Sequence, residues 1–245
     1  MLQIKNLTKH FGGVKAVNNC SFKVKKNSVT ALIGPNGSGK TTVFNLISQL
    51  VDEDFGEIFL EKTDISKFSP TQVAQTGVSR LYQKAQLFEN LTVKENLLLA
   101  LSNEDTKFWK NFLSLYSYSD EQEKKVMKAL ERIHLQNYKD TLTRELSYGQ
   151  KRLVEIMRTI LQPHKLLLFD EPVAGVMPKL REEIAKIIRE LKKEGDTILL
   201  IEHDMNFALN LADEVIVLDE GKVIARGTPE EIRQNKKVLE AYLGE

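Results

Sequence analysis

The chain has 245 residues, 42% hydrophobic and 28% charged, which is enough for one large hydrophobic core or two interlocked subdomains. Its 35 basic and 34 acidic residues leave a formal net charge of +1, so overall charge does not favour nucleic acid or an acidic membrane as a partner. Cys20 is the only cysteine, which excludes an internal disulfide and a cysteine-rich metal site and fits a reducing cytoplasm.

No membrane-spanning segment is expected from the sequence. The first residues show no signal-peptide pattern, and no stretch approaches the roughly 20 apolar residues that a transmembrane helix needs. If the protein serves a membrane process, we expect another chain to provide the spanning part.

Residues 1–33 predict a β-rich start. Residues 21–25 alternate as a half-buried strand does, and residues 30–33 form a short apolar run that ends at Gly34, which is typical of a buried strand. Apolar residues then recur at helical spacing: Val43, Phe44, Ile47 and Leu50. The order is therefore strand, glycine-rich loop, helix, and residues 56–60 predict another short strand.

Residues 92–161 have a different pattern, in which apolar residues recur among many charges without a clear strand, and they predict a mostly helical insertion. Within it, residues 105–118 contain Trp109 and several other aromatic residues. Local packing in a helical subdomain is favoured over a ligand cage for this aromatic segment.

The last third of the chain returns to alternating strands and helices. Strands are predicted at residues 166–169, 197–201 and 214–218. Between the first two of these strands, one apolar helix face ends near Gly195. After the third strand, Thr228 is followed by a proline and then a glutamate three residues on, which is the pattern of a helix start. Alternating β and α elements indicate an α/β core with a largely parallel sheet.

The loop between the strand at 30–33 and the following helix matches the pattern G-x-x-x-x-G-K-S/T. It consists of Gly34, Pro35, Asn36, Gly37, Ser38, Gly39, Lys40 and Thr41. Glycines let backbone N–H groups converge on phosphate oxygens, and the helix that follows points its positive end at them. Lys40 would add a charge at the β- and γ-phosphates, and the Thr41 hydroxyl would bind Mg²⁺. The motif predicts nucleoside triphosphate binding.

Two carboxylates, Asp170 and Glu171, follow the strand at 166–169, at the sheet edge where ligands of α/β proteins gather. Asp170 is placed to act on Mg²⁺, and Glu171 to polarise the attacking water. His203 follows the strand at 197–201 and is a candidate to face the γ-phosphate. Gln83 precedes the helical insertion and indicates nothing by itself.

The segment Leu146-Ser147-Tyr148-Gly149-Gln150 resembles the LSGGQ signature of ABC ATPases. The order of phosphate loop, Gln83, signature, acidic strand end and His203 also matches that family over essentially the whole chain. The resemblance implies one ABC ATPase domain with a P-loop NTPase (RecA-like) core, an N-terminal antiparallel β subdomain and an inserted helical subdomain. The core would comprise residues 1–91 and 162–245, and the helical subdomain residues 92–161.

The same resemblance implies roles for individual residues. Phe11 would stack on adenine, Thr42 would extend the nucleotide-binding loop, and Gln83 would sense Mg²⁺ and the transmembrane partner. Glu171 would be the catalytic base, with His203 on the γ-phosphate. Three signature residues would cap the ATP bound to the opposite subunit of a head-to-tail dimer: Ser147, Gly149 and Gln150.

Within the family, the chain most resembles the ATPases of high-affinity branched-chain amino acid importers. The supporting features are residues 11–17, Tyr148, residues 174–175, residues 201–205 and residues 241–245. This implies permease subunits, a second ATPase subunit and, indirectly, an extracytoplasmic binding protein as partners, at the cytoplasmic face of the membrane. ATPases of urea or amide importers, of lipopolysaccharide exporters, and soluble ABC ATPases such as iron–sulfur assembly factors remain alternatives.

Two residues depart from the family pattern. Tyr148 replaces the usual central glycine of the signature, although Gly149 keeps a backbone N–H available. The segment that follows the acidic strand end is called the D-loop in this family. It usually carries aspartate or a similar polar residue at the position of Met177. Since methionine donates no hydrogen bond and accepts weakly, we expect weaker coupling between the two ATP sites of the dimer.

Overall fold

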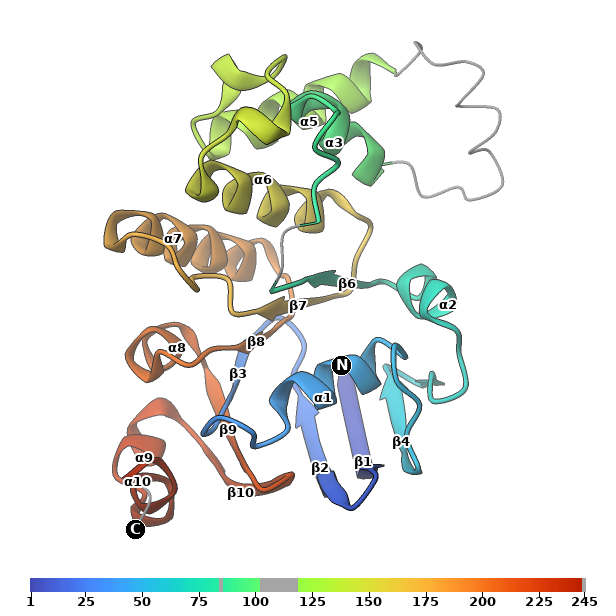
Figure 1. Cartoon of the computed structure of the whole chain (residues 1–245), viewed down its shortest axis with the longest axis vertical. Helices are drawn as coiled ribbons and strands as arrows, with labels where there is room; N and C mark the ends of the chain where they lie inside the picture. Colours follow the sequence, from blue (N-terminus) through green and yellow to red (C-terminus); the bar gives the residue numbers. More distant parts are fainter. Residues whose placement is uncertain (84–85, 102–118, 244–245) are drawn as a thin grey trace.

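The computed structural model describes residues 1–83, 86–101 and 119–243, which form two β-sheets with helices around them (Figure 1). The smaller sheet is antiparallel, with the strand order β2 (Val14–Val24), β1 (Leu2–Phe11), β4 (Phe55–Leu60) and β5 (Thr63–Asp64). The larger sheet has the order β10 (Lys222–Gly227), β9 (Glu214–Asp219), β3 (Val29–Ile33), β8 (Ile198–Ile201), β7 (Leu166–Asp170) and β6 (Val78–Leu81).

The larger sheet is parallel except at one edge, where β10 pairs antiparallel with β9. Strands β3, β7 and β8 are buried along their whole length because helices or the smaller sheet cover both faces. On β7, for example, Leu168 belongs to the core that contains α1 (Lys40–Ile47), whereas Phe169 belongs to the core that contains α7 (Pro178–Glu194). The predicted α/β class with a largely parallel sheet is confirmed.

Helix α1 lies between the two sheets, where its buried residues share one core with β1, β4 and β7. It ends earlier than its apolar spacing indicated. Gln49 has a φ of 52°, which breaks the helix, and Leu50 is left 47% exposed. The apolar residue at position 50 therefore does not extend the buried face. Helix α7, in contrast, ends as predicted, with Gly195 in the left-handed region at a φ of 99°.

The helices of the insertion lie together at one end of the molecule (Figure 1). They are α3 (Val93–Leu101), α5 (Asp120–Arg132) and α6 (Tyr148–Leu161), with 3₁₀ turns at Gln136–Tyr138 and Thr143–Glu145. Among the described residues of this segment, the only β pairing is an isolated bridge between Thr92 and Leu142. The aromatic segment at 105–118 lies outside the described residues.

Four further helices complete the described structure: α2 (Pro70–Gln75), α8 (Met205–Leu211), α9 (Pro229–Arg233) and α10 (Lys236–Leu243). Helix α9 starts as predicted, because the Thr228 hydroxyl accepts from the N–H of Glu231 and the Glu231 carboxylate accepts from the N–H of Thr228. The sequence did not reveal α2, α8, β6 or β10. None of the described helices combines the length and the apolar character that crossing a bilayer requires.

Candidate functional site

The loop at residues 34–41 joins the end of β3 to α1, and two of its glycines are required by their surroundings. A Cβ on Gly34 would lie 2.0 Å from the Leu218 carbonyl oxygen, and one on Gly39 would lie 2.2 Å from the Ala16 carbonyl oxygen. Gly39 also has a φ of 100°. The loop is therefore held tightly between β9 and the β1–β2 hairpin, which fixes its backbone for ligand binding.

Lys40, the first residue of α1, has a buried side chain that reaches back over the loop. Its ammonium donates to the carbonyls of Gly34 at 2.9 Å and Pro35 at 2.8 Å, and to the Ser38 hydroxyl at 3.3 Å. Burial lowers the pKa of Lys40, and the carboxylates of Glu171 and Asp170 oppose this. The ammonium therefore lies close enough to both carboxylates for their charges to act on it.

Three of the predicted residues meet at the carboxyl ends of neighbouring strands. Glu171, directly after β7, places one carboxylate oxygen 2.6 Å from His203 Nε2, and its other oxygen accepts from the Gln83 amide at 2.9 Å. Gln83 follows β6, and His203 follows β8. Glu171 itself is buried and has a φ of 49°, a conformation that costs a residue other than glycine roughly 1 kcal/mol or more.

Asp170 ends β7, and its two carboxylate oxygens have different environments. One accepts from the Arg80 guanidinium at 2.8 Å, and the other is buried without a hydrogen-bond partner. Burial raises the pKa of Asp170, and the Arg80 guanidinium opposes that rise. A buried oxygen without a donor is an available ligand for a hard cation, so the donor set suits Mg²⁺. The described residues contain no group of three histidines, cysteines or carboxylates that would hold a metal alone.

Arg152 on α6, which the sequence did not indicate, binds the backbone of both acidic residues of the site. It is 2% exposed, and it donates to the carbonyls of Asp170 at 3.1 Å, Glu171 at 2.8 Å and Tyr82 at 2.8 Å. It thereby ties α6, the helix that begins within the signature, to the backbone of Asp170 and Glu171 and of Tyr82. A basic residue on a helical face gives no sequence signal for this function, because such residues are mostly solvent-exposed.

The signature residues lie apart from this cluster. Ser147 caps α6 through a reciprocal pair with Gln150, in which the Ser147 N–H donates to Gln150 Oε1 at 2.9 Å. The Tyr148 hydroxyl donates to the Ala174 carbonyl at 3.0 Å. Within the ranges that the structure describes, no hydrogen bond or ion pair joins residues 147–150 to residues 34–41. The structure therefore does not bring the two motifs together in one chain.

The remaining predicted residues lie at the end of β1, in the first turn of α1 and at the start of α7. Phe11 ends β1 and is 48% exposed, and its hairpin reaches the phosphate loop through Ala16, which packs on Gly39. Thr41 and Thr42 lie in the first turn of α1, with Thr41 exposed. Met177 is 75% exposed and occupies the N-cap of α7 without a side-chain hydrogen bond.

Comparison with known proteins identifies the class. Residues 17–174 match the family model of the ABC transporter, which is more than half of the chain. The chain belongs to the ABC transporter family, as one of its ATP-binding subunits, which hydrolyse ATP to drive transport. The final residues, 222–245, match a second model, described as branched-chain amino acid ATP-binding cassette transporter.

Individual relatives agree with the second model. The chain is 38% identical over its whole length to a probable branched-chain amino acid transport ATP-binding protein, LivG, of Archaeoglobus fulgidus, covering 95% of that protein. It is also 38% identical to LivG of Escherichia coli K12, a high-affinity branched-chain amino acid transport ATP-binding protein, covering 98% of it.

Solved structures show the same fold. A nucleotide-free ATP-binding cassette from an ABC transporter superimposes with a TM-score of 0.86 at 37% identity, covering 100% of this chain and 99% of that one. An ADP-bound form of an ATP-binding cassette also gives a TM-score of 0.86, at 36% identity and with 100% and 99% coverage. The predicted ABC ATPase fold is confirmed, and nucleotide binding is a property of the family.

Proposed function

We propose that this chain binds and hydrolyses ATP to energise the uptake of branched-chain amino acids through separate permease subunits. The observation that carries the proposal is the contact of Glu171 with both His203 and Gln83, at the strand ends beside the phosphate loop. The substrate class comes from the relatives of 38% identity, which are branched-chain amino acid transport proteins matched over nearly their whole length.

In this proposal, backbone N–H groups of residues 34–41, with Thr42, hold the phosphates, and the Lys40 ammonium exchanges its carbonyl partners for phosphate oxygens. Glu171 orients the attacking water and accepts its proton. His203, now on Glu171, turns to the γ-phosphate. Mg²⁺, when bound, neutralises charge on the phosphate oxygens, and Thr41, Gln83 and Asp170 are the residues that would hold it.

The site is completed by a second ATPase subunit. Ser147 is exposed, Gly149 and Gln150 are half-buried, and none of the three is hydrogen-bonded to residues 34–41 of its own chain, which supports a role on ATP held by a partner in a head-to-tail dimer. Dimeric ATP-binding cassettes at 23–24% identity share the fold of this chain. Closure of the dimer would be transmitted through Gln83 and the helical subdomain at residues 92–161 to permeases at the cytoplasmic face of the membrane.

The test is to co-purify the chain with its permeases after gentle detergent extraction and to reconstitute the complex in liposomes. With an extracytoplasmic binding protein present, we expect ATP-dependent uptake of leucine, isoleucine or valine, and its loss with Lys40→Ala. Uptake of urea or an amide instead would overturn the substrate class alone. Association only with soluble iron–sulfur assembly proteins would overturn the transport function.

A further inference from the structure

Arg80 on β6 connects Asp170, a proposed Mg²⁺ ligand, to helix α1. Its side chain is 6% exposed, and its guanidinium donates to Asp170 on β7 at 2.8 Å through one terminal nitrogen. The other terminal nitrogen donates to Asn45 at 2.9 Å and Ser48 at 3.3 Å, both at α1. Arg80 therefore contacts both the helix that begins at Lys40 and the strand that carries Asp170.

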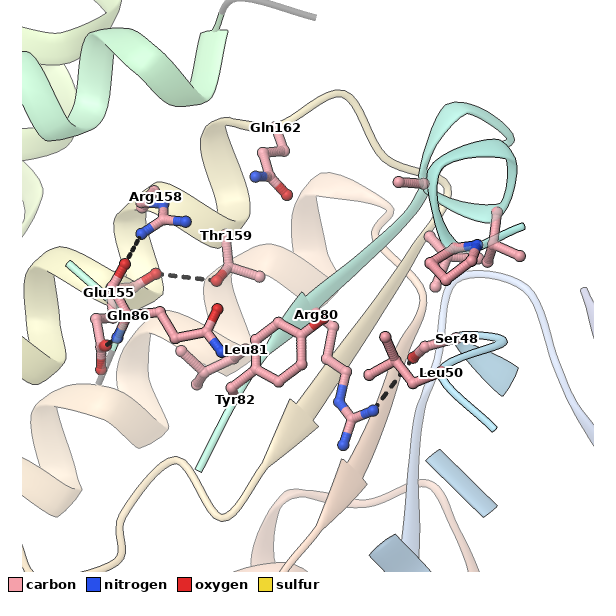
Figure 2. A pocket seen from close by; sticks show the side chains of 14 residues that line it. Ser48, Leu50, Arg80, Leu81, Tyr82, Gln86, Glu155, Arg158, Thr159 and Gln162 are labelled. Carbon is pink, nitrogen blue, oxygen red and sulfur yellow. Dashed lines mark hydrogen bonds between the residues drawn. The ribbon is translucent and has the colours of Figure 1, made fainter. Parts of the chain in front are cut away.

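Two aromatic rings lie close to this guanidinium. Its central carbon lies 4.9 Å from the centre of the Tyr82 ring and 5.5 Å from that of Phe44. Figure 2 shows Arg80 extending from β6 toward Ser48, with Tyr82 beside it, along one wall of a cavity of about 290 Å³. Since its hydrogen bonds and ring contacts come from three directions, the guanidinium has little freedom to rotate.

The consequence for Asp170 is a fixed carboxylate. Breaking the hydrogen bond between Arg80 and Asp170 would leave two unpaired charges in a buried site, which is costly. The carboxylate therefore keeps its orientation, and its second oxygen stays where no protein group donates to it. A metal ligand that is oriented by a second residue binds its ion more tightly, and loss of such a residue typically costs 10–100-fold in metal affinity.

The geometry points to Arg80 as a positioning residue that presents the free oxygen of Asp170 to Mg²⁺ and so sets the affinity of the site for the ion. This inference rests on the proposed function, which assigns Asp170 to Mg²⁺. Lysine would supply the charge but not the fork that contacts Asp170 and Asn45 at once. Arg80→Lys should therefore retain part of the effect, and Arg80→Gln little of it.

The experiment measures binding of a fluorescent ATP analogue to the purified full-length chain, first in EDTA and then with increasing Mg²⁺. We expect Arg80→Gln to raise the half-saturating Mg²⁺ concentration by roughly 10-fold or more, with Arg80→Lys in between. Binding in EDTA should change less than about twofold, because the phosphate loop is untouched. Substituting Mn²⁺ and recording its magnetic resonance spectrum would report the ion directly.

Arg158→Gln is the matched control. Arg158 lines the same cavity, but its guanidinium donates to the Gln86 carbonyl and has no contact with Asp170 (Figure 2). Its Mg²⁺ dependence should equal that of the unchanged chain. Asn45→Ala keeps the ion pair between Arg80 and Asp170 but removes one hydrogen-bond acceptor of the guanidinium. It should therefore raise the half-saturating Mg²⁺ concentration less than Arg80→Gln does. If Arg80→Gln does not fold, Asn45→Ala and Arg80→Lys test the inference instead.

An unmoved Mg²⁺ dependence in folded Arg80→Gln, or in both Arg80→Lys and Asn45→Ala, would overturn the inference while leaving the proposed function intact. If the unchanged chain itself binds the nucleotide with no dependence on Mg²⁺, the metal assignment of the proposed function is overturned, and this inference with it.

Discussion

The two halves of the proposed ATP site differ in how deeply one chain buries them. In the strand-end cluster, which we define as Gln83, Asp170, Glu171 and His203, Glu171 contacts Gln83 and His203, and the two acidic residues are almost fully buried. The signature face, which we define as residues 147–150 together with Met177, is turned to solvent, with Tyr148 54% and Met177 75% exposed. The acidic residues of one half are therefore buried, whereas Tyr148 and Met177 of the other half are exposed, although Tyr148 donates to Ala174 and Ser147 pairs with Gln150.

We relate this difference to two functions: hydrolysis of ATP at the strand-end cluster, and contact between subunits at the signature face. In the strand-end cluster, Glu171 is held between His203 and Gln83, and in the proposed mechanism these contacts exchange for the attacking water and the γ-phosphate. The signature face is linked to the chain beyond the cluster by the hydrogen bond from Tyr148 to the Ala174 carbonyl, and Arg152, further along α6, donates to the main-chain carbonyls of Asp170 and Glu171. Substitutions in the first half should change turnover, whereas those in the second should change what happens between subunits.

The largest effect is expected from Glu171→Gln. The amide cannot accept a proton, so ATP turnover should fall about 10²–10⁴-fold, while ATP binding remains and the ATP-bound dimer becomes more stable. Phosphate release and size-exclusion chromatography with ATP would measure both. Glu220→Gln is a matched control, because Glu220 also has a positive φ, of 44°, but an exposed side chain. Full turnover by Glu171→Gln would remove Glu171 from its proposed role.

Mixed dimers would test whether the two halves act across subunits. Lys40→Ala disables the phosphate loop, and Ser147→Arg blocks the signature, at a cost of about 1 kcal/mol for the lost helix cap. Each variant alone should be inactive, but a mixture should regain part of the ATPase activity, because one intact composite site forms per mixed dimer. Absence of recovery, when mixed dimers are shown to form, would mean that the signature acts in its own chain.

A pH-dependent effect on stability is expected at Glu202, beside the cluster. Glu202 is 3% exposed, accepts from the Val173 N–H at 3.2 Å, and has its pKa raised from 4.5 to about 7, chiefly by burial. The folded chain therefore holds a proton that the unfolded chain loses as the pH rises from 4.5 to 7, so stability falls over that range.

Glu202→Gln removes this cost. The gain in the free energy of unfolding should be small near pH 5, grow to the order of 3 kcal/mol by about pH 7.5 and then level off. Urea unfolding of both chains at several pH values would measure it. A difference that is constant with pH would contradict the assignment.

The smallest effect is expected from Met177→Asp on the signature face. Aspartate at the N-cap of α7 should stabilise the chain by about 1 kcal/mol, because Met177 supplies no cap. We also expect higher ATPase activity or stronger cooperativity in ATP. Met177→Ala separates the two effects, since it removes methionine without adding a polar group. Unchanged activity and cooperativity in Met177→Asp would refute the coupling hypothesis, whatever the stability.

The sequence predicts best where local pattern and burial agree. Strands β3, β7 and β8 are continuous apolar runs, and Gly195 and Thr228 mark a helix end and a helix start. It predicts poorly where long-range packing decides. Strand β6 contains Ser79 and Arg80, so its pattern does not indicate a buried strand, yet parallel pairing with β7 places it there.

For the site, motifs predicted the groups that we expect a nucleotide to meet. The phosphate loop and Glu171 follow from residue type and position at strand ends. Arg80 and Arg152 were missed because their partners are distant: Arg80 and Asp170 are 90 residues apart in sequence. Which charged side chain neutralises a buried carboxylate depends on strand order in the folded sheet, and no local pattern records that order.

The left-handed backbone at Glu171 has a consequence for evolution in the laboratory. Glycine or asparagine adopts that conformation more readily than glutamate does, so either would relieve strain at position 171. A library selected for heat tolerance alone should accumulate those residues there, whereas one selected for growth on imported nutrient should keep glutamate. At position 171, selection for stability therefore favours glycine or asparagine, whereas selection for transport activity favours glutamate.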